Sequence, residues 1–372
     1  MLARISKNIF NNRTLYNKVI KRGIKTLNYG DGIPSETVYE SSDYSDEKII
    51  DVLGNERIAV IGYGPQGRAQ ALNLRDRGLD VVVGLRENSS SWTHAEMDGF
   101  NNNRLLSIGE ATNYGTIVMN LLSDSGQIEQ YDIMKKNLRK GDALYFSHGF
   151  GVTYSDKTGM NVDELDGVDV ILVAPKGCGA SVRDYFVNGN GGINSSYAVY
   201  QNMTGNAKER ALALAFGIGS PYVYETTFYN EVTSDLVGER SVLMGGIAGL
   251  FMANYKVLRE NGHTPSEAFN ETVEEALQSL YPLINEKGMD YMFANCSTTA
   301  QRGAIDWSKR FESVNTKLIR ELYSSVESGN EADFVIDANS DKDYRCRLNE
   351  ELSEIANEEI WRVGKVIRKL RK

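Results

Sequence analysis

The stretch RIAVIGYGPQGRAQALNLRDRG, residues 57–78, constrains the fold more than any other part of the sequence. It opens with a largely apolar run typical of a strand that is buried on both faces of a sheet. Three glycines, Gly62, Gly64 and Gly67, follow at once, and the residues after them favour a helix. A strand, a glycine-rich turn and a helix in this order begin a βαβ unit, so we expect a parallel sheet.

Similar apolar runs recur up to about residue 225, each ending in turn-forming residues. They read RIAVIGYG, DVVVGLR, TIVMNLLS, DALYFSHG and VDVILVAP. The segments between them have the length and amphipathic pattern of helices. The sequence therefore predicts a doubly wound, Rossmann-like α/β domain over residues 48–226.

The strand pattern stops after about residue 226. Residues 235–326 and 346–370 carry apolar side chains at three- and four-residue spacing, which predicts helices. NGHTP and NEKGMD mark breaks between helices, and residues 327–343 have the composition of a surface loop. We expect an all-helical second domain over residues 227–372.

The composition narrows the class of protein. A chain of 372 residues is long enough for two domains. We find no apolar run that approaches 18 residues, so we expect no transmembrane helix. The three cysteines, Cys178, Cys296 and Cys346, are too few and too scattered for a disulfide framework or a cysteine zinc site.

Charge is distributed unevenly along the chain. Residues 1–30 carry seven basic side chains and no acidic one, while the rest of the chain carries 34 basic and 50 acidic residues. This composition predicts a mitochondrial transit peptide, with an end we cannot place, and hence the mitochondrial matrix. The alternative is a basic arm that binds nucleic acid, but the acidic remainder argues against nucleic-acid binding by the mature protein.

The glycine-rich turn predicts a dinucleotide site. Its first glycine permits the tight turn, the second lets the backbone approach the pyrophosphate, and the third lets helix pack on strand. The pyrophosphate would lie at the helix N-terminus, where Pro65 gives no N–H but fits the first turn. The cofactor-binding residues expected here are Gly62, Tyr63, Gly64, Pro65, Gln66 and Gly67.

The end of the second strand indicates which dinucleotide is bound. An NAD enzyme would have an acidic residue there to bind the ribose hydroxyls. Here Arg86 ends the strand, and Arg86, Ser89 and Ser91 can bind a 2′-phosphate, so NADPH is favoured. Glu87 keeps the NAD alternative open.

Two pairs of acidic residues lie four positions apart on predicted helices: Asp235 with Glu239, and Glu271 with Glu275. Like charges at this spacing repel by roughly 0.2–0.5 kcal/mol. A single pair is commonly a solvated helix face, but both pairs are flanked by apolar residues. Four carboxylates without His or Cys favour Mg²⁺ or Mn²⁺, and they suffice for two ions that share a bridging group.

Other polar residues near these motifs have two interpretations each. Glu231 and Glu267 extend the two acidic rows, and we interpret them as surface groups or as groups that support the ligands. His148 and Lys176 follow strand ends, where doubly wound sheets bind ligands, but a turn histidine and a surface lysine would look the same. Ser297 could be a ligand or a helix N-cap.

Long motifs now resemble a known family, ketol-acid reductoisomerase (acetohydroxyacid isomeroreductase) of the fungal mitochondrial type. They include GYGPQGRAQALNLRDRG, MNLLSD, YFSHGF, VILVAPKGCGASVR, ETTFYNEVTSDLVGER, GHTPSEAFNETVEEALQSLYPLINEKGMDYM and CSTTAQRGAIDW. The resemblance covers nearly the whole chain. It departs at Pro65, where the family commonly has Ser or Ala, and at Ala180, where a larger polar residue is usual.

The resemblance implies a reaction. Members of the family act on 2-acetolactate or 2-aceto-2-hydroxybutyrate, which are 2-hydroxy-3-keto acids. Mg²⁺ assists an alkyl shift, and NADPH reduces the resulting 2-keto group to give a 2,3-dihydroxy acid of the valine and isoleucine pathway.

The resemblance also implies roles for single residues. Asp235 would bridge two Mg²⁺ ions and Glu239 would bind one, with Glu271 and Glu275 completing the site from a partner subunit of a homo-oligomer, at least a dimer. Glu275 would also act as acid or base on a substrate hydroxyl. Further matches are His148 and Lys176 as polar catalytic groups, Ser297 as the substrate-binding serine, and Ser123 in the cofactor site.

Two other hypotheses remain open from the residues alone. One is an NADP-dependent hydroxyacid dehydrogenase without isomerisation, which the four carboxylates argue against. The other is a dinucleotide-binding protein without catalysis, which the polar site residues argue against.

Overall fold

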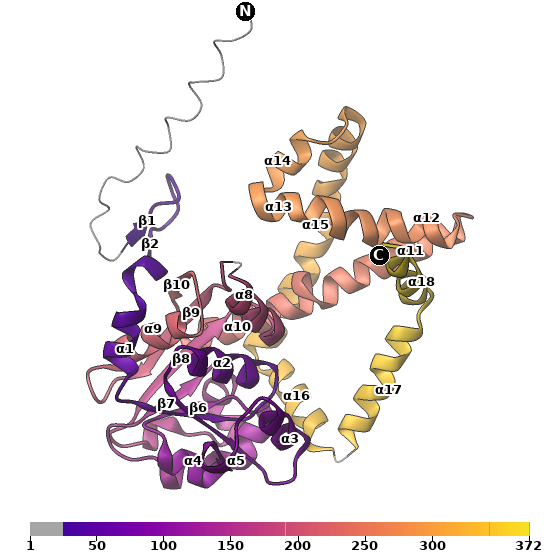
Figure 1. The fold of residues 1–372 in the computed structure, drawn as a ribbon. Helices are drawn as coiled ribbons and strands as arrows, with labels where there is room; N and C mark the ends of the chain where they lie inside the picture. The colour runs from indigo at the N-terminus through magenta and orange to yellow at the C-terminus, as the bar shows by residue number, and fades with distance from the viewer. Residues whose placement is uncertain (1–24, 190, 342, 372) are drawn as a thin grey trace, which may run out of the picture. The chain divides into compact units, whose positions relative to one another are not determined.

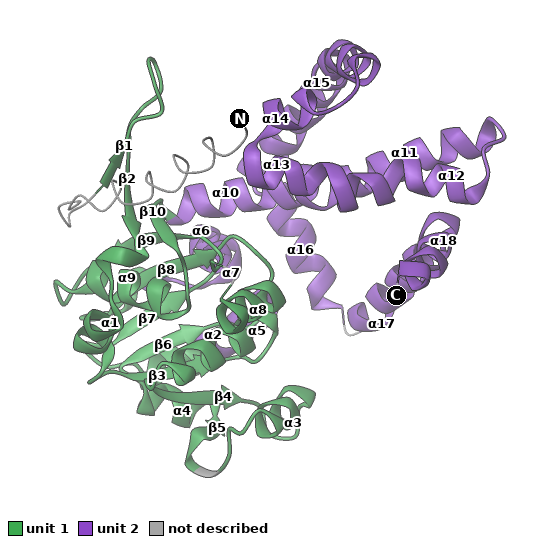
Figure 2. Ribbon diagram, turned by 45° about the horizontal axis from the view of Figure 1, so that its top comes forward, with its two compact units in different colours: residues 1–122, 132–147, 163–227 green, residues 123–131, 148–162, 228–372 purple. Residues whose placement is uncertain are grey.

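The computed structural model describes residues 25–189, 191–341 and 343–371. They form two compact units (Figure 2). Unit 1 runs to residue 122 and continues through residues 132–147 and 163–227. Unit 2 consists of residues 123–131, 148–162 and 228–372. The expected transit peptide, residues 1–30, lies almost entirely outside the described residues.

Among the described residues, ten strands of unit 1 form one sheet (Figure 1). Their order is β1-β2-β10-β9-β8-β7-β6-β3-β4-β5. Their bounds are β1 (Lys25–Leu27), β2 (Glu36–Glu40), β3 (Arg57–Ile61), β4 (Asp80–Leu85), β5 (Leu105–Ser107), β6 (Ile117–Asn120), β7 (Ala143–Phe146), β8 (Asp169–Pro175), β9 (Ser195–Gln201) and β10 (Tyr222–Glu225). All five strands predicted from apolar runs are present, as β3, β4, β6, β7 and β8.

The sheet is parallel from β8 to β5. From β3 the chain moves outward to β4 and β5, and it then returns to β6 on the other side of β3. Because such crossovers are right-handed, the reversal places α2 (Pro65–Asp76) and α4 (Ile108–Tyr114) on opposite faces. The carboxyl ends of β3 and β6 therefore form the switch point at which doubly wound sheets bind ligands.

The other half of the sheet departs from the parallel pattern. Strand β9 pairs antiparallel with β8, β10 pairs parallel with β9, and β2 pairs antiparallel with β10. The sequence analysis did not predict these strands because they lack a continuous apolar run. Parts of these strands are exposed, as Tyr200 on β9 and Tyr222 on β10 are, although both strands lie inside the sheet.

The other helices and short helical turns before residue 227 join these strands. They are η1 (Ser41–Asp43), α1 (Asp46–Leu53), α3 (Ser90–Met97), η2 (Asn102–Arg104), α5 (Asp124–Asn137), α6 (Phe150–Thr153), α7 (Ser155–Thr158), η3 (Val162–Glu164), α8 (Gly179–Asn188) and α9 (Ala207–Gly217). The main core of unit 1 lies under α1, α2 and α9, where Tyr44 stacks on Phe216 with ring centroids 4.7 Å apart.

Unit 2 is helical after residue 227, as predicted. Its helices are α10 (Phe228–Gly238), the π-helical turn η4 (Glu239–Leu243), α11 (Gly245–Glu260), α12 (Pro265–Phe269), the π-helical turns η5 (Asn270–Glu274) and η6 (Ala276–Leu280), α13 (Tyr281–Lys287), α14 (Met289–Ala294), α15 (Thr298–Glu327), α16 (Asn330–Ser340), α17 (Tyr344–Asn357), α18 (Glu359–Ile367) and the 3₁₀ turn η7 (Arg368–Arg371). The predicted breaks at NGHTP and NEKGMD fall between α11 and α12 and between α13 and α14.

Two expectations for this region were wrong. The predicted loop at residues 327–343 contains α16, because Ala332, Val335 and Ile336 have helical spacing and pack into an apolar cluster with Phe150. The acidic residues between them hid this pattern. The segment Phe228–Glu260 is also long and apolar enough to cross a membrane, by length and composition, contrary to our reading that no such run exists.

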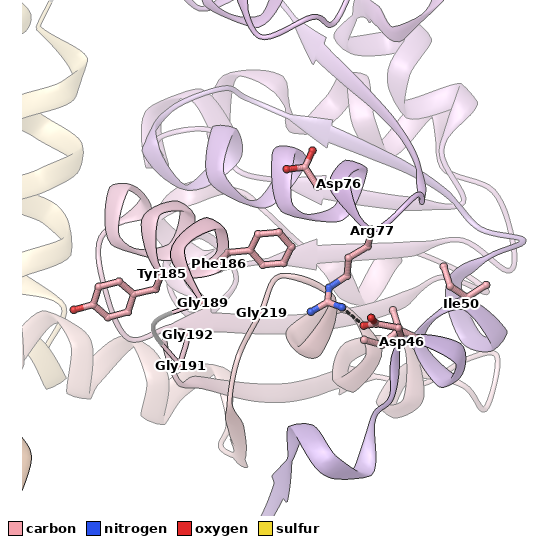
Figure 3. Close-up of a pocket in the computed structure, with 11 residues that line it drawn as sticks. Asp46, Ile50, Asp76, Arg77, Tyr185, Phe186, Gly189, Gly191, Gly192 and Gly219 are labelled. Carbon is pink, nitrogen blue, oxygen red and sulfur yellow. Dashed lines mark hydrogen bonds and ion pairs between the residues drawn. The ribbon is translucent and has the colours of Figure 1, made fainter.

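A pocket in unit 1 lies at the C-terminal ends of α2 and α8 (Figure 3). It has a volume of about 600 Å³. Arg77 and Asp46, which both line the pocket, form an ion pair. Phe186 and Tyr185 line it from α8. The glycine-rich turn lies at the N-terminal end of α2, so this pocket is separate from the predicted cofactor site and holds none of the predicted site residues.

Candidate active site

The three glycines after β3 differ in the space that a Cβ atom would have at each position. Gly62 has φ +99°, and a Cβ on it would lie 2.7 Å from the carbonyl oxygen of Leu121. A Cβ on Gly67 would lie 2.2 Å from the carbonyl oxygen of Gly62. At Gly64, by contrast, an added Cβ would meet nothing within 4 Å. The first and third glycines shape the turn, while the second faces open space where a ligand can approach.

The first turn of α2 can bind an anion. Gly64 is the N-cap and Pro65 the first helical residue, and the first hydrogen bond of the helix runs from Arg68 N to Gly64 O over 2.9 Å. The N–H groups of Gln66 and Gly67 precede that bond and have no acceptor within the helix. These donors and the helix dipole suit a pyrophosphate.

Two of the residues predicted to bind the cofactor form side-chain hydrogen bonds to other parts of the protein. Gln66 Nε2 donates to Gly177 O over 2.8 Å, and the hydroxyl of Tyr63 donates to Asp98 over 3.0 Å. The polar side-chain groups of both residues are therefore already hydrogen-bonded within the protein.

The end of β4 presents the residues expected to bind a 2′-phosphate. Arg86 is exposed directly after the strand, and Ser89 is the N-cap of α3. The Ser89 oxygen accepts from Trp92 N over 3.2 Å, which leaves its hydroxyl hydrogen available to a ligand. Ser91 is half-buried in the first turn, and Glu87 is exposed, so the NAD alternative also has its residue in place.

A bidentate ion pair joins α2 to the end of α3, and the sequence analysis missed it. Arg68 Nε and Nη2 donate to the two oxygens of Asp98 over 2.6 and 2.8 Å. The Arg68 hydrogen bond, aided by Tyr63, holds the pKa of Asp98 below its usual value against partial burial. The pair connects the glycine-rich turn to the helix that begins at Ser89.

Lys176 is exposed directly after β8, and its backbone N–H donates to Asn194 O over 2.7 Å. The loop that follows packs closely on the glycine-rich turn, because a Cβ on Gly179 would lie 2.1 Å from the carbonyl oxygen of Pro65. Unit 1 thus brings the predicted lysine and the predicted cofactor loop together.

A cluster of polar groups in unit 2 surrounds His148. Its Nδ1 lies 3.2 Å from Glu231 Oε2 and 3.4 Å from Asp235 Oδ2. Glu231 is 2% exposed and also accepts from Gly149 N over 3.1 Å. Within the described residues, these three are the one group of three or more His, Cys, Asp or Glu whose ligand atoms lie within 4.8 Å of one another.

The carboxylates control the charge of His148. Burial lowers its pKa, but the hydrogen bond to Glu231 and the surrounding negative charges outweigh burial and raise it to about 9. The other contributing carboxylates are those of Asp124 and Asp235. The sequence analysis did not select Asp124. Burial raises the pKa of Asp124, and the charge of His148 partly offsets this effect.

Asp235 and Glu239 lie at the junction of α10 and the π-helical turn η4. Both side chains are half-buried. Burial and the charge of Asp235 raise the pKa of Glu239, while Arg240, with Nη1 2.6 Å from Glu239 Oε1, partly offsets them. Arg240 in turn donates from Nε to Glu331 of α16 over 2.8 Å. Isolated π-helical turns of this kind are frequent at functional sites.

The second acidic row also lies on π-helical structure. Glu271 is on η5, Glu275 lies between η5 and η6, and both are exposed. Glu274, between them, points inward and pairs with Arg371. Glu271 and Glu275 do not join the group around His148 in a single chain. The sequence analysis expected apolar surroundings for Glu271 and Glu275, but both side chains are exposed.

The remaining predicted residues are placed as follows. Ser297 is exposed and caps α15, accepting from Ala300 N over 3.2 Å, so the N-cap interpretation is confirmed and its hydroxyl hydrogen stays available. Ser123 is exposed just before α5, with its oxygen 3.4 Å from that of Ser125. Glu267 is exposed and forms a capping box with Thr264, whereas Glu231 is buried, so only Glu267 is a surface group.

Comparison with known protein families gives matches along most of the chain. The family model described as acetohydroxy acid isomeroreductase, NADPH-binding domain, matches residues 52–222. The model described as ketol-acid reductoisomerase, C-terminal domain, matches residues 228–372.

Several curated proteins are similar over nearly their full length. A mitochondrial ketol-acid reductoisomerase of Neurospora crassa is 54% identical over 94% of this chain and 86% of its own. A probable mitochondrial ketol-acid reductoisomerase of Schizosaccharomyces pombe is 53% identical over the same shares. A ketol-acid reductoisomerase (NAD⁺) of Desulfosudis oleivorans is 52% identical over 93% of this chain and 97% of its own.

Solved structures show the same relationship. An NADH-preferring ketol-acid reductoisomerase from an uncultured archean is 33% identical, with a TM-score of 0.79 over 90% of this chain and 98% of the other. A semialdehyde dehydrogenase NAD-binding protein from Cupriavidus necator is 15% identical with a TM-score of 0.56, and this likeness concerns the fold alone.

Proposed function

Because the chain belongs to the ketol-acid reductoisomerase family, we propose how its residues carry out the family's reaction with NADPH and Mg²⁺. The resemblance to the fungal mitochondrial type is confirmed. The protein is an oxidoreductase with an isomerase step, uses a nicotinamide cofactor and serves branched-chain amino acid biosynthesis. The proposed substrates are 2-acetolactate and 2-aceto-2-hydroxybutyrate. The observation that carries the proposal is the carboxylate row of α10 and η4 beside His148.

The donor set of this row fits Mg²⁺. Asp235 and Glu239 are adjacent, half-buried carboxylates, and burial together with the negative charge of Asp235 raises the pKa of Glu239, two effects that a bound cation would offset. Hard oxygen donors of this kind suit Mg²⁺. Asp235 would hold both ions and Glu239 one of them, while Glu271 and Glu275 would come from a second copy. Mg²⁺ would polarise the substrate oxygens and stabilise the charge that develops during the alkyl shift.

A second copy of the chain is the proposed partner, because unit 2 leaves a long apolar face uncovered. On α15 the exposed residues Trp307, Phe311, Val314 and Leu318 recur at helical spacing. The segment Phe228–Glu260 exposes further apolar residues in its second half. This segment is poorly suited to cross a membrane, because its first turns carry the acidic residues Glu231, Asp235 and Glu239. A homodimer would cover these faces and supply Glu271 and Glu275.

NADPH is proposed on the residues after β4. Arg86 with the hydroxyls of Ser89 and Ser91 provides a cation and donors for a 2′-phosphate. Relatives named for NAD⁺ and for NADP⁺ both occur, so the family alone leaves the choice open. The open face at Gly64 and the free N–H groups of α2 would bind the pyrophosphate, and the bound cofactor would supply the hydride.

The chain's own polar groups then act on the substrate. His148, held by Glu231, presents its Nε2 as a fixed donor. Lys176 adds positive charge where negative charge develops. Glu275 would exchange a proton with a substrate hydroxyl, and Ser297 would donate a hydrogen bond to the substrate.

The mitochondrial matrix is the proposed location. Residues 1–30 have a transit-peptide composition, and the fungal relatives are named mitochondrial. Sequencing the N-terminus of the protein isolated from mitochondria would test this, and an uncleaved chain outside the matrix would contradict it.

Product analysis separates the proposed reaction from simple reduction. We expect 2-acetolactate, NADPH and Mg²⁺ to give 2,3-dihydroxy-3-methylbutanoate, in which the two methyl groups share one carbon. Reduction without rearrangement gives 2,3-dihydroxy-2-methylbutanoate, an isomer of the same mass. Proton NMR distinguishes them: the first shows two methyl singlets, and the second shows one singlet and one doublet. The second pattern would support the hydroxyacid dehydrogenase instead.

A further inference from the structure

A buried hydrogen-bond network lies directly beneath the glycine-rich turn in unit 1. Its centre is Gln70, on the second turn of α2, which is 0% exposed. Gln70 Nε2 donates to Gln66 Oε1 over 3.1 Å and to Ser147 Oγ over 2.9 Å. Gln70 Oε1 accepts from the hydroxyl of Tyr145 over 2.8 Å. Both amide hydrogens and the amide oxygen of Gln70 are therefore used.

Tyr145 closes the network from β7. Its ring is fully buried, and its hydroxyl lies 3.0 Å from Val173 O on β8 and 3.1 Å from Ser147 Oγ. The single hydroxyl hydrogen is shared between Gln70 Oε1 and Val173 O, and the hydroxyl oxygen accepts from Ser147. Burial raises the pKa of Tyr145, so the hydroxyl stays protonated.

The network ends at three segments of unit 1 that lie next to predicted site residues. Gln66 belongs to the cofactor turn, and its amide continues the network to Gly177 O over 2.8 Å. Gly177 directly follows Lys176 in the chain, and Ser147 directly precedes His148. An apolar residue at position 70 could make none of the three hydrogen bonds of the Gln70 amide.

We propose that Gln70 is a positioning residue, which holds the cofactor turn in register with the loop that carries Lys176. Leucine at this position would leave Gln66 Oε1, Ser147 and Tyr145 short of partners in a buried place, and these groups would have to move to find others. A shift of about 1 Å between cofactor and catalytic group can cost about a hundredfold in rate. The inference rests on the proposed cofactor site and on Lys176.

Asn73 offers a matched control one turn further along α2. It is also a fully buried amide, and it makes the same number of bonds: Nδ2 donates to Val182 O and Ile218 O over 3.3 and 2.9 Å, and Oδ1 accepts from Arg183 over 2.8 Å. Its partners lie on α8, beyond the residue that packs on the cofactor turn, and at the end of α9, and none of them belongs to that turn or to the loop of Lys176. Its loss should destabilise the fold without moving the site.

The experiment compares Gln70→Leu with Asn73→Leu in the full-length protein. Thermal unfolding measures stability, NADPH fluorescence titration without substrate measures cofactor binding, and steady-state kinetics measures kcat and KM. We expect both variants to melt earlier than the wild type, and kcat/KM for NADPH to fall about tenfold or more in Gln70→Leu but less than twofold in Asn73→Leu. Equal kinetic losses, or wild-type kinetics in Gln70→Leu, would overturn the proposal.

Tyr145→Phe provides a second, milder variant in case Gln70→Leu does not fold. It keeps the ring and removes only the hydroxyl, so we expect a smaller fall in kcat/KM for NADPH. Where Gln70→Leu folds, the double variant should lose less than the product of the two single effects, since both act through one network. Independent effects would overturn the shared network. Failure of the proposed function is distinguishable, because the wild type would then not turn over 2-acetolactate.

Discussion

Nδ1 of His148 lies 3.2 Å from Oε2 of Glu231, a carboxylate that is 2% exposed and that also accepts from the backbone of Gly149. A buried carboxylate is stable only with such partners. The contact sets the orientation of the ring and leaves Nε2 as the nitrogen that can meet a substrate. Glu231 therefore supports the site rather than lying on the surface.

Replacing Glu231 by Gln should impair turnover more than cofactor binding. Glutamine keeps the volume of the side chain but loses its charge. Its NH₂ group can face the N–H of His148, and two donors cannot form a hydrogen bond. We expect kcat with 2-acetolactate to fall about a hundredfold, the order of loss that a small misplacement of a reacting group can cause, with KM for NADPH unchanged. Glu267→Gln is the control: it retains the capping box and should keep wild-type kinetics. Equal effects of both variants would contradict this role.

Gly62 and Gly64 should respond differently to alanine. Gly62→Ala places a Cβ against Leu121 at positive φ, so we expect a loss of about 1–3 kcal/mol in the free energy of unfolding. Gly64→Ala meets no protein atom, so its stability should stay within about 1 kcal/mol of the wild type. Its KM for NADPH should nevertheless rise, because the methyl group occupies the approach to the pyrophosphate. Urea unfolding and steady-state kinetics measure both; unchanged NADPH binding in Gly64→Ala would contradict the assigned turn.

Arg86→Ala tests the choice of cofactor. A hydrogen bond to a charged group contributes about 1.5–3 kcal/mol, so KM for NADPH should rise about tenfold or more while KM for NADH changes little. The comparison is made on one enzyme preparation with both cofactors. Glu87→Ala is the counterpart, which should leave NADPH kinetics intact. A loss with NADH in Glu87→Ala and none with NADPH in Arg86→Ala would reverse the assignment.

The apolar face of α15 should be an interface between two copies. Val314 is 72% exposed in the single chain, and we expect Val314→Asp to weaken the dimer and lower activity. Met97→Asp is the control, at a residue of unit 1 that is 79% exposed. Light scattering without detergent measures the mass of each protein. A wild type that is monomeric and fully active would contradict the shared site.

Much of unit 1 followed from the sequence because its signals are local. Strands buried on both faces read as continuous apolar runs. The positive φ of Gly62 and the contact of Gly67 with the backbone of Gly62 both arise within one turn. The antiparallel strands and α16 were missed, because part-exposed strands and a helix with interleaved acids carry no clear periodicity.

The acidic rows show where sequence reasoning stops. The spacing of Asp235 and Glu239 predicted that they would lie together. The partners of the buried Glu231, however, are His148 and Gly149, which are distant in the chain. The partners of Gln70 are likewise far apart in sequence. Glu271 and Glu275 do not join the group around His148 within one chain, so their proposed role rests on a second copy.

The most direct test of this account measures NADPH oxidation by the purified protein with 2-acetolactate, with Mg²⁺ and after chelation, for the wild type and Asp235→Asn. The account predicts turnover that requires Mg²⁺ and is abolished in the variant, while NADPH still binds to both proteins. Turnover that survives chelation and the substitution would contradict it, and would mean that the paired carboxylates are structural.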